Sequence, residues 1–290
     1  MYKKVVSGKN IIQIFNYKWL LLIVPLFYTL SVLYYPIINI IKLSFVDDSG
    51  FTLAHIKDVL TEPLYIEVLK NTFKIAFFVT ILSLLISYPI SYYMAITHSN
   101  KLKKFILGLV MITLWISLLV RTFTWSVILQ DHGIVNRLLM NLGLIEQPLK
   151  LLYTNTSVVI GMTHVLIPYM ILSLYSVMDS IDLRLIQAAQ GLGARPSKAF
   201  YQVFLPLSAH GILSGSLIVF VMSLGYFITP SLLGGNNSMM ISKLIEQNIQ
   251  ATLNWNLASA LSILLLGATL LLLGISAWLS RFSPMIKEER

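Results

Sequence analysis

Six long apolar stretches constrain this chain more than any other feature of its sequence. They lie near residues 19–41, 75–96, 105–129, 155–178, 208–230 and 257–280, and each is 22 to 25 residues long. About 20 residues of α-helix cross the ~30 Å hydrocarbon core of a bilayer. The stretches do not alternate polar and apolar residues as the strands of a membrane barrel do. The sequence therefore predicts an all-α polytopic membrane protein with six transmembrane helices.

The composition agrees with one membrane domain over residues 1–290. Only 11% of the residues are charged, against about 25% in soluble domains. The net charge of +9 does not indicate a nucleic-acid partner, because the basic residues follow the pattern of topology determinants. The first apolar stretch has full spanning length and no small-residue cleavage site, so we expect it to remain as a membrane helix. The chain has no cysteine, which excludes thiolate metal sites, and we expect no bound metal.

Lysine and arginine are distributed unevenly between the two sides that six spans define. One side receives thirteen of the 21 basic residues. These are Lys3, Lys4, Lys9, Lys18, Lys101, Lys103, Lys104, Arg184, Arg195, Lys198, Arg281, Lys287 and Arg290. The other side receives eight of the twelve acidic residues. Because basic loops stay in the cytoplasm, we expect both termini and the loop 179–206 to be cytoplasmic. We also expect the N-terminal lysines to hold an interfacial piece at lipid headgroups before Trp19.

The loop 179–206 is polar, yet its pattern is too regular for a simple tether. Asp182 stands where a helix N-cap is expected. One helical stripe follows, formed by Leu183, Ile186, Ala189 and Gln190. Gly191 and Gly193 then interrupt this first helix. The pattern predicts a short helix at the membrane surface that ends in a glycine hinge.

A second short helix is expected directly after the hinge. Arg195 precedes a proline and is therefore disfavoured in the α region, whereas Pro196 fits the first position of a helix. Its apolar side consists of Ala199, Phe200, Val203 and Phe204. Leu205 and Pro206 are expected to end it.

The same loop carries a family resemblance. Gln187, Ala188 and Ala189, with Gly193 four positions later and Leu205-Pro206 at the end, resemble the EAA loop of bacterial ABC importer permeases. The family has glutamate where this chain has Gln187, so one charge is missing. The resemblance implies the type I permease fold and a loop that couples to a separate ATPase. The coupling residues that it implies are Gln187, Ala188, Ala189, Gly193, Arg195, Pro196, Leu205 and Pro206.

Four further segments resemble PotB-type permeases of spermidine/putrescine importers. They are Ser117–Trp125, Pro148–Tyr153, Phe227–Gly235 and Ile245–Gln247, and the likeness covers about residues 15–280. It implies a heterodimer with a second, PotC-like permease, an ABC ATPase dimer and an extracytoplasmic solute-binding protein. ATP and Mg would bind to the ATPase, and no cofactor is expected in this chain. The implied location is the inner membrane.

Enzyme motifs are absent from the sequence. The chain has no GxxxxGK[ST] loop, no HExxH and no GxSxG, so ATP must be hydrolysed by a separate subunit. Three alternatives stay open: a permease for another small solute such as an amino-acid-like or other organic ion, a carrier or channel that works without ATP, and a structural or insertion factor of the membrane. The spans lack the acidic residues that a carrier predicts, and the EAA spacing argues against an insertion factor.

A few residues are candidates for the substrate pathway. Arg121 is the one charge well inside an apolar stretch, sixteen residues beyond Phe105 and so roughly 24 Å along a straight helix. Such a charge is expected to face protein or water, although it could also snorkel to the outer headgroups. The outer ends of the spans offer acids and aromatic rings for a polyamine. These candidates are Trp125, Asp131, Tyr226, Phe227 and Glu246. For Trp125 an aromatic belt is the stronger interpretation, and Tyr226 and Phe227 are equally compatible with ordinary packing.

Local signals predict finer features. Short helices are expected between the third and fourth spans and over Met240–Leu253. Gly211 and Gly215 form a GxxxG step, which allows close helix packing within the chain or with a partner. His164 precedes Pro168 by four residues and is expected to bond the carbonyl that the proline frees, with a proton relay as the alternative. Pro25, Pro36, Pro89, Pro168 and Pro230 are expected to kink or end spans.

Overall fold

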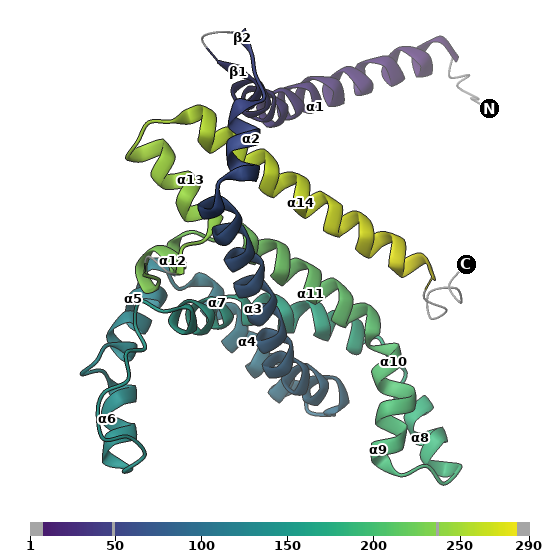
Figure 1. The fold of residues 1–290 in the computed structure, drawn as a ribbon. Coiled ribbons are helices and arrows are strands. Elements are labelled where there is room, and N and C mark those ends of the chain that lie inside the picture. The colour runs from purple at the N-terminus through teal and green to yellow at the C-terminus, as the bar shows by residue number, and fades with distance from the viewer. Residues whose placement is uncertain (1–7, 48–49, 236–237, 283–290) are drawn as a thin grey trace, which may run out of the picture.

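The computed structural model describes residues 8–47, 50–235 and 238–282, which form a helical bundle (Figure 1). The charged ends with Lys3, Lys4, Lys287 and Arg290 lie outside the described residues. The elements in the first half are α1 (Gly8–Phe45), β1 (Val46–Asp47), β2 (Gly50–Phe51), α2 (Ala54–Thr61), α3 (Pro63–Ile96), α4 (Asn100–Trp115), α5 (Leu118–Leu129), α6 (Ile134–Asn141) and α7 (Asn155–Met178). Those in the second half are α8 (Arg184–Gly191), α9 (Pro196–Ala199), a π-helical turn (Phe200–Phe204), α10 (Leu205–Leu207), α11 (Ala209–Leu224), α12 (Ile228–Leu233), α13 (Ile241–Gln250) and α14 (Trp255–Phe282).

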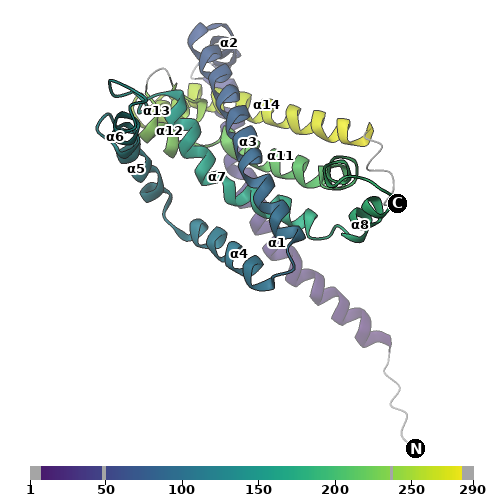
Figure 2. The same cartoon turned by 90° about the horizontal axis from the view of Figure 1, so that it is seen from below.

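Helices α3, α7 and α11 form the centre of the bundle (Figure 2). α3 and α7 run parallel, because hydroxyl groups on α3 donate to α7 carbonyls at a constant sequence offset. Ser87 donates to Ile167 over 3.4 Å and Ser91 donates to Ile171 over 3.3 Å. The core side of α7 is a fully buried stripe with a spacing of four residues, consisting of Val158, Met162, Leu166, Met170, Leu174 and Met178. A stripe at this spacing occupies one side of a helix, so α7 is the central packing element.

The two glycines of the GxxxG step bring α11 close to α7. A Cβ at Gly211 would lie 3.1 Å from the Cβ of Val177, and one at Gly215 would lie 2.8 Å from the Sδ of Met170. The hydroxyl groups of Ser173 and Ser214 are 3.0 Å apart at the same contact. The intramolecular alternative for this motif is therefore confirmed.

Helices α1 and α14 form a separate pair beside this centre. They pack on each other, and α13 packs on α14. α1 extends away from the other helices in both views (Figures 1 and 2). It is continuous from Gly8, so the separate interfacial piece expected before Trp19 is not found among the described residues.

The six predicted spans are found in modified form. Four helices are long and apolar enough to cross a membrane, and they contain Leu22–Phe45, Pro63–Ile96, Asn155–Met178 and Trp255–Ser276. Two bent helix pairs bring the number to six when each pair is counted as one span. The prediction of one straight helix over 105–129 is wrong, since the chain bends by 93° between Trp115 and Leu118. Ile116 and Ser117 are extended there.

The predicted fifth span, 208–230, is also corrected. α11 ends at Leu224, and Gly225 and Tyr226 separate it from the short helix α12. At its other end a 58° bend joins α11 to the helical segment Pro196–Leu207. The two short helices expected outside the spans are confirmed as α6 and α13. The prolines at 25, 36, 89 and 168 lie inside helices and end none of them.

Candidate functional site

Helix α8 carries the predicted coupling motif, and local side-chain and backbone bonds define both of its ends. The Asp182 carboxylate accepts the backbone N–H of Arg184 over 2.9 Å, as an N-terminal capping residue does. At the other end, Ala194 donates to the carbonyl of Ala189 over 3.0 Å and Gly193 donates to that of Gln190 over 2.9 Å. This pair of bonds is a Schellman motif, in which the C′ residue adopts a left-handed conformation.

Gly193 occupies this C′ position with a φ of 89°. A Cβ added there would meet no atom of the described part of the chain within 4 Å. The glycine is therefore required by the backbone conformation and not by crowding. Gly193 lies four residues after Ala189 because the Schellman motif pairs Ala189 with Ala194, the residue that follows the left-handed position.

The outer side of α8 is exposed and lies on a protruding part of the molecule (Figure 1). Gln187 and Ala188 are exposed, and Leu192 at the end of the helix is 91% exposed. Leu183 and Ile186 pack against the hydrophobic core. Of the predicted stripe, Gln190 instead lies on the exposed side. The helix thus presents small and apolar side chains outward while its other side is fixed.

The second loop helix anchors this segment to α3. Arg195 is extended and Pro196 begins α9 as predicted. The ring of Tyr92 on α3 lies 5.1 Å from that of Phe200 and 4.7 Å from that of Phe204, edge-on in both cases. Phe204 is fully buried. This aromatic cluster links the exposed motif mechanically to a central helix.

Leu205 and Pro206 do not end the second helix, which is a correction. The helix continues to Leu207 through a π-helical turn, in which Leu205 donates to the carbonyl of Phe200. Proline has no N–H to donate to the backbone hydrogen bonds of the helix. The π-helical turn directly before Pro206 accommodates this missing hydrogen bond. The bend follows at Ser208, whose hydroxyl lies 2.9 Å from that of Tyr88.

Arg121 lies on α5, beyond the unexpected break in the third span. Its Nε and one terminal nitrogen are buried and have no hydrogen-bond partner among the described residues. Hydroxyl groups of Thr122 on α5 and Thr229 on α12 lie 3.3 Å apart next to it. α5 therefore packs on α12 as well as on α7, and the guanidinium faces this junction.

Two other side chains share the junction with Arg121. The guanidinium interacts electrostatically with His164 on α7 and with Tyr226 between α11 and α12. The rings of Trp125 and His164 lie 5.8 Å apart in an edge-on arrangement. The Nδ1 of His164 has no partner among the described residues, so the bond expected near Pro168 is absent at this nitrogen. Sequence reasoning did not place His164 here, since only the bend in the third span brings α5 to it.

The remaining pathway candidates lie elsewhere. Asp131 is exposed in the turn before α6, and Phe227 is 43% exposed at the start of α12. Glu246 on α13 forms an ion pair with Lys243 over 2.7 Å. The structure thus groups Arg121, Trp125 and Tyr226 with His164, whereas Asp131 and Glu246 are not part of this cluster.

Comparison with known proteins supports one family. The model for binding-protein-dependent transport system inner membrane components matches residues 87–283. The chain is 36% identical over 204 residues to the spermidine/putrescine transport system permease protein PotB of Haemophilus influenzae, covering 70% of this chain and 71% of that protein. It is 31% identical over 237 residues to PotB of Escherichia coli, covering 79% and 86%.

Known structures show the same fold. A bacterial ABC transporter that imports the acidic polysaccharide alginate aligns with a TM-score of 0.74 at 20% identity, over 95% of this chain and 99% of that one. The MetNI methionine ABC transporter aligns with a TM-score of 0.58 at 16% identity, over 76% and 98%. The family match covers more than half of the chain, and the two relatives are above 30% identity. The chain therefore belongs to the binding-protein-dependent inner membrane components, which are multi-pass permease subunits of ABC importers and not enzymes.

Proposed function

We propose that this permease imports a polyamine, spermidine or putrescine, and couples to its ATPase through α8. The observation that carries the coupling role is the surface of exposed Gln187 and Ala188 beside half-buried Ala189, anchored behind by Phe204 in a buried aromatic cluster. A force on α8 is transmitted to α3 because packed side chains hardly compress. The polyamine substrate rests on the two PotB relatives.

The partners follow from the same proposal. An ABC ATPase dimer binds ATP and Mg and docks on the loop 179–206, a second PotC-like permease completes the pathway, and an extracytoplasmic protein delivers the solute. In this arrangement both termini and α8 face the cytoplasm. The ion pair between Lys103 at the start of α4 and Asp179 after α7, 3.1 Å long, places the basic α3–α4 connection on the same side as α8.

Tyr226 and Trp125 are the aromatic groups that we assign to the cationic solute. Both rings contact the core next to the α5–α12 junction, where a cation–π contact contributes about 0.5–2 kcal/mol. Asp131 and Phe227, which are exposed, serve at the outer mouth. Glu246 is already paired with Lys243, so its carboxylate has a smaller part.

The test is uptake of labelled spermidine into proteoliposomes that contain this chain with its partner subunits and ATP. Tyr226→Ala should reduce uptake at least tenfold, because it removes packing and a cation-binding face together. Glu246→Gln should reduce it less than threefold. ATPase binding should be unchanged in both variants. Normal uptake by Tyr226→Ala, or an equal rise in the KM for neutral and cationic solutes, would contradict the aromatic role.

Arg121 favours a second candidate, an organic solute with a carboxylate such as an amino acid. A buried guanidinium without a counter-ion is costly and would repel a polycation, whereas a carboxylate could form a bidentate pair with it. The same liposomes distinguish the two solutes. Uptake of labelled spermidine that only excess unlabelled spermidine suppresses favours the polyamine. Uptake of a labelled amino acid that excess amino acids suppress and spermidine does not favours the second candidate.

A further inference from the structure

We propose that α3 and α7 hold one phospholipid of the phosphatidylethanolamine type at the end of the bundle opposite α8. Its phosphate lies on Lys70 and Lys74, its ammonium group faces Glu67, and its acyl chains lie in two apolar grooves below. The site is separate from the coupling motif and from the α5–α12 junction.

The polar part of the site is a groove at the upper end of α3. Glu67, Lys70, Asn71 and Lys74 line it from α3, and Asn155 lines it from α7. Their spacing on α3 places them along one side of the helix. Asn71 is held in place, since its amide donates to the carbonyl of Met239 over 3.1 Å and accepts from the amide of Asn155 over 3.0 Å. Among the described residues, no ion pair involves Glu67, Lys70 or Lys74.

The charges of this groove match a zwitterionic headgroup. Two exposed ammonium groups can bind a phosphate diester, and each basic residue near a lipid surface adds appreciably to binding. Glu67 lies about one helical turn above Lys70 and two turns above Lys74, where the ammonium of an ethanolamine would be. An anionic headgroup such as phosphatidylglycerol would leave this carboxylate without a partner.

Lys74 also borders two grooves that are mainly apolar, although Asn155 and Thr156 line one edge of the first. One lies between α3 and α7 and is lined by Ile75, Phe78, Leu82 and Val159, with a volume of about 340 Å³. The step from Lys74 to Leu82 extends roughly 12 Å along the helix. The change from polar to apolar lining at Lys74 is what a headgroup joined to an acyl chain requires.

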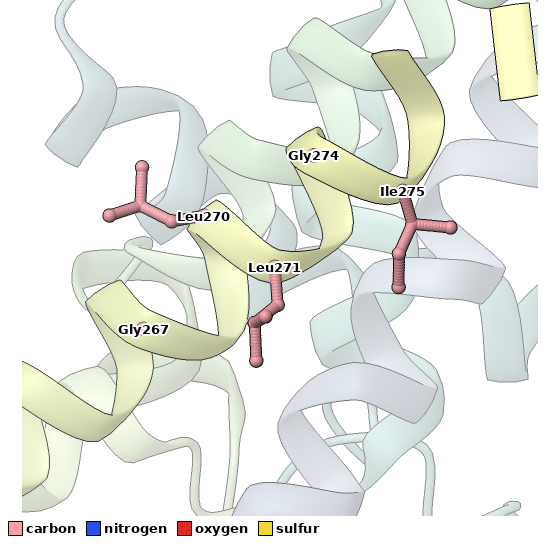
Figure 3. A pocket seen from close by; sticks show the side chains of 5 residues that line it. All are labelled: Gly267, Leu270, Leu271, Gly274 and Ile275. Atoms are coloured by element: carbon pink, nitrogen blue, oxygen red, sulfur yellow. The ribbon is translucent and has the colours of Figure 1, made fainter. Parts of the chain in front are cut away.

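The second apolar groove lies between α3, α11 and α14. Phe77 on α3 and Phe220 on α11 line it together with Leu271 on α14, and its volume is about 590 Å³. Leu271 also borders the shallow pocket between Gly267 and Gly274 shown in Figure 3. None of the described residues has an atom within 4 Å of the Cβ position of either glycine. The surface below Lys74 is therefore apolar on both sides of α3, with room for two chains.

The depth of Lys74 fits a headgroup. Lys74 lies 22 residues from the end of α3 at Ile96, which is roughly 33 Å at ~1.5 Å per residue. Asn155 lies at a similar distance from the end of the parallel helix α7 at Met178. The hydrocarbon core is ~30 Å thick, so both residues lie at its boundary when Ile96 and Met178 lie at the opposite boundary.

Native mass spectrometry of the full-length chain, alone and assembled with its partner subunits, tests the site. The probes are phosphatidylethanolamine, phosphatidylglycerol with the same acyl chains, and inorganic phosphate. Lys70→Gln combined with Lys74→Gln should weaken binding of both lipids about 30-fold, which is about 2 kcal/mol at 1.4 kcal/mol per factor of ten. The matched control combines Lys101→Gln with Lys104→Gln at the other end of the bundle and should bind as the wild type does.

Two further variants separate the headgroup from the chains. Glu67→Gln should weaken phosphatidylethanolamine about tenfold and leave phosphatidylglycerol unchanged. Val159→Trp fills the α3–α7 groove and should weaken both lipids while both lysines remain. The proposal is overturned if the variant with Lys70→Gln and Lys74→Gln binds lipid as the wild type does, or if inorganic phosphate competes as well as the lipids do. It is also overturned if assembly with the partner subunits displaces the lipid, because the grooves then belong to a protein interface.

Discussion

Replacing Gly193 by alanine should uncouple ATP hydrolysis from transport without disturbing insertion into the membrane. Gly193 has a φ of 89° and closes the Schellman motif at the end of α8. An L-residue in a left-handed conformation costs about 1–2 kcal/mol. Within the residues that the structure describes, no atom lies within 4 Å of its Cβ position, so the whole effect comes from the backbone. A cost of this size changes the population of the intact helix end about 5- to 30-fold.

The size of the effect should follow the conformational preferences of the side chain. Asparagine visits the left-handed region more readily than alanine does, so Gly193→Asn should retain part of the coupling. Gly193→Val should lose the most, because a β-branched residue is least tolerated at positive φ. Gly191→Ala is the matched control, since Gly191 is helical and also has open space at its Cβ position. Alanine there should leave coupling intact or improve helix stability by up to about 1 kcal/mol.

The assay compares two quantities in proteoliposomes with the partner subunits present. One is the ATP hydrolysed for each solute imported, and the other is the amount of ATPase that co-purifies with the permease. Gly193→Ala should raise the first and lower the second, with unchanged amounts of permease in the membrane. The reasoning is refuted if Gly193→Val couples normally, or if Gly191→Ala is as harmful as Gly193→Ala.

Three further predictions follow from the same geometry. Phe204→Ala should lower the free energy of unfolding by about 3–5 kcal/mol. The control Tyr201→Ala, at a position 65% exposed, should change the free energy of unfolding by less than about 0.5 kcal/mol. Thermal unfolding in detergent measures both variants. Gly215→Val should destabilise by about 1–3 kcal/mol through overpacking against α7, and an unchanged unfolding temperature would contradict the close contact. In intact cells, a cysteine introduced at Ser197 should not react with an impermeant thiol reagent, whereas a cysteine introduced at Thr61 should be labelled. The chain has no native cysteine that would add background labelling. The reverse pattern would invert the proposed topology.

Features set by neighbours in the sequence could be predicted. The fourth span was predicted at 155–178 and is found as Asn155–Met178, because Thr154 and Ser157 form a capping box at its start. The extended Arg195 and the helix beginning at Pro196 follow from proline sterics alone. Capping and proline sterics act between residues that are close in the sequence, so a single sequence is enough to predict these features.

Contacts between distant segments could not be predicted. Tyr92 lies more than 100 residues before Phe200 and Phe204 in the sequence, and no local pattern indicates that their rings meet. The end of α11 at Leu224 was also missed, because the residues up to Pro230 continue the apolar run. An apolar pattern predicts which residues are buried away from water, but it does not distinguish one long helix from two shorter ones.

The third span shows how one such break changes a functional argument. A straight helix would place Arg121 roughly 24 Å from Phe105, near outer headgroups to which it could snorkel. The helix instead stops at Trp115 and turns by 93°, so only the first roughly 15 Å lie along the direction of α4. Arg121 then lies at the α5–α12 junction near His164 on α7, and its Nε is buried without a partner among the described residues. Snorkelling requires an exposed guanidinium, so the structure favours the alternative in which Arg121 faces protein. The deciding feature is the bend between Trp115 and Leu118, which neither proline nor glycine marks.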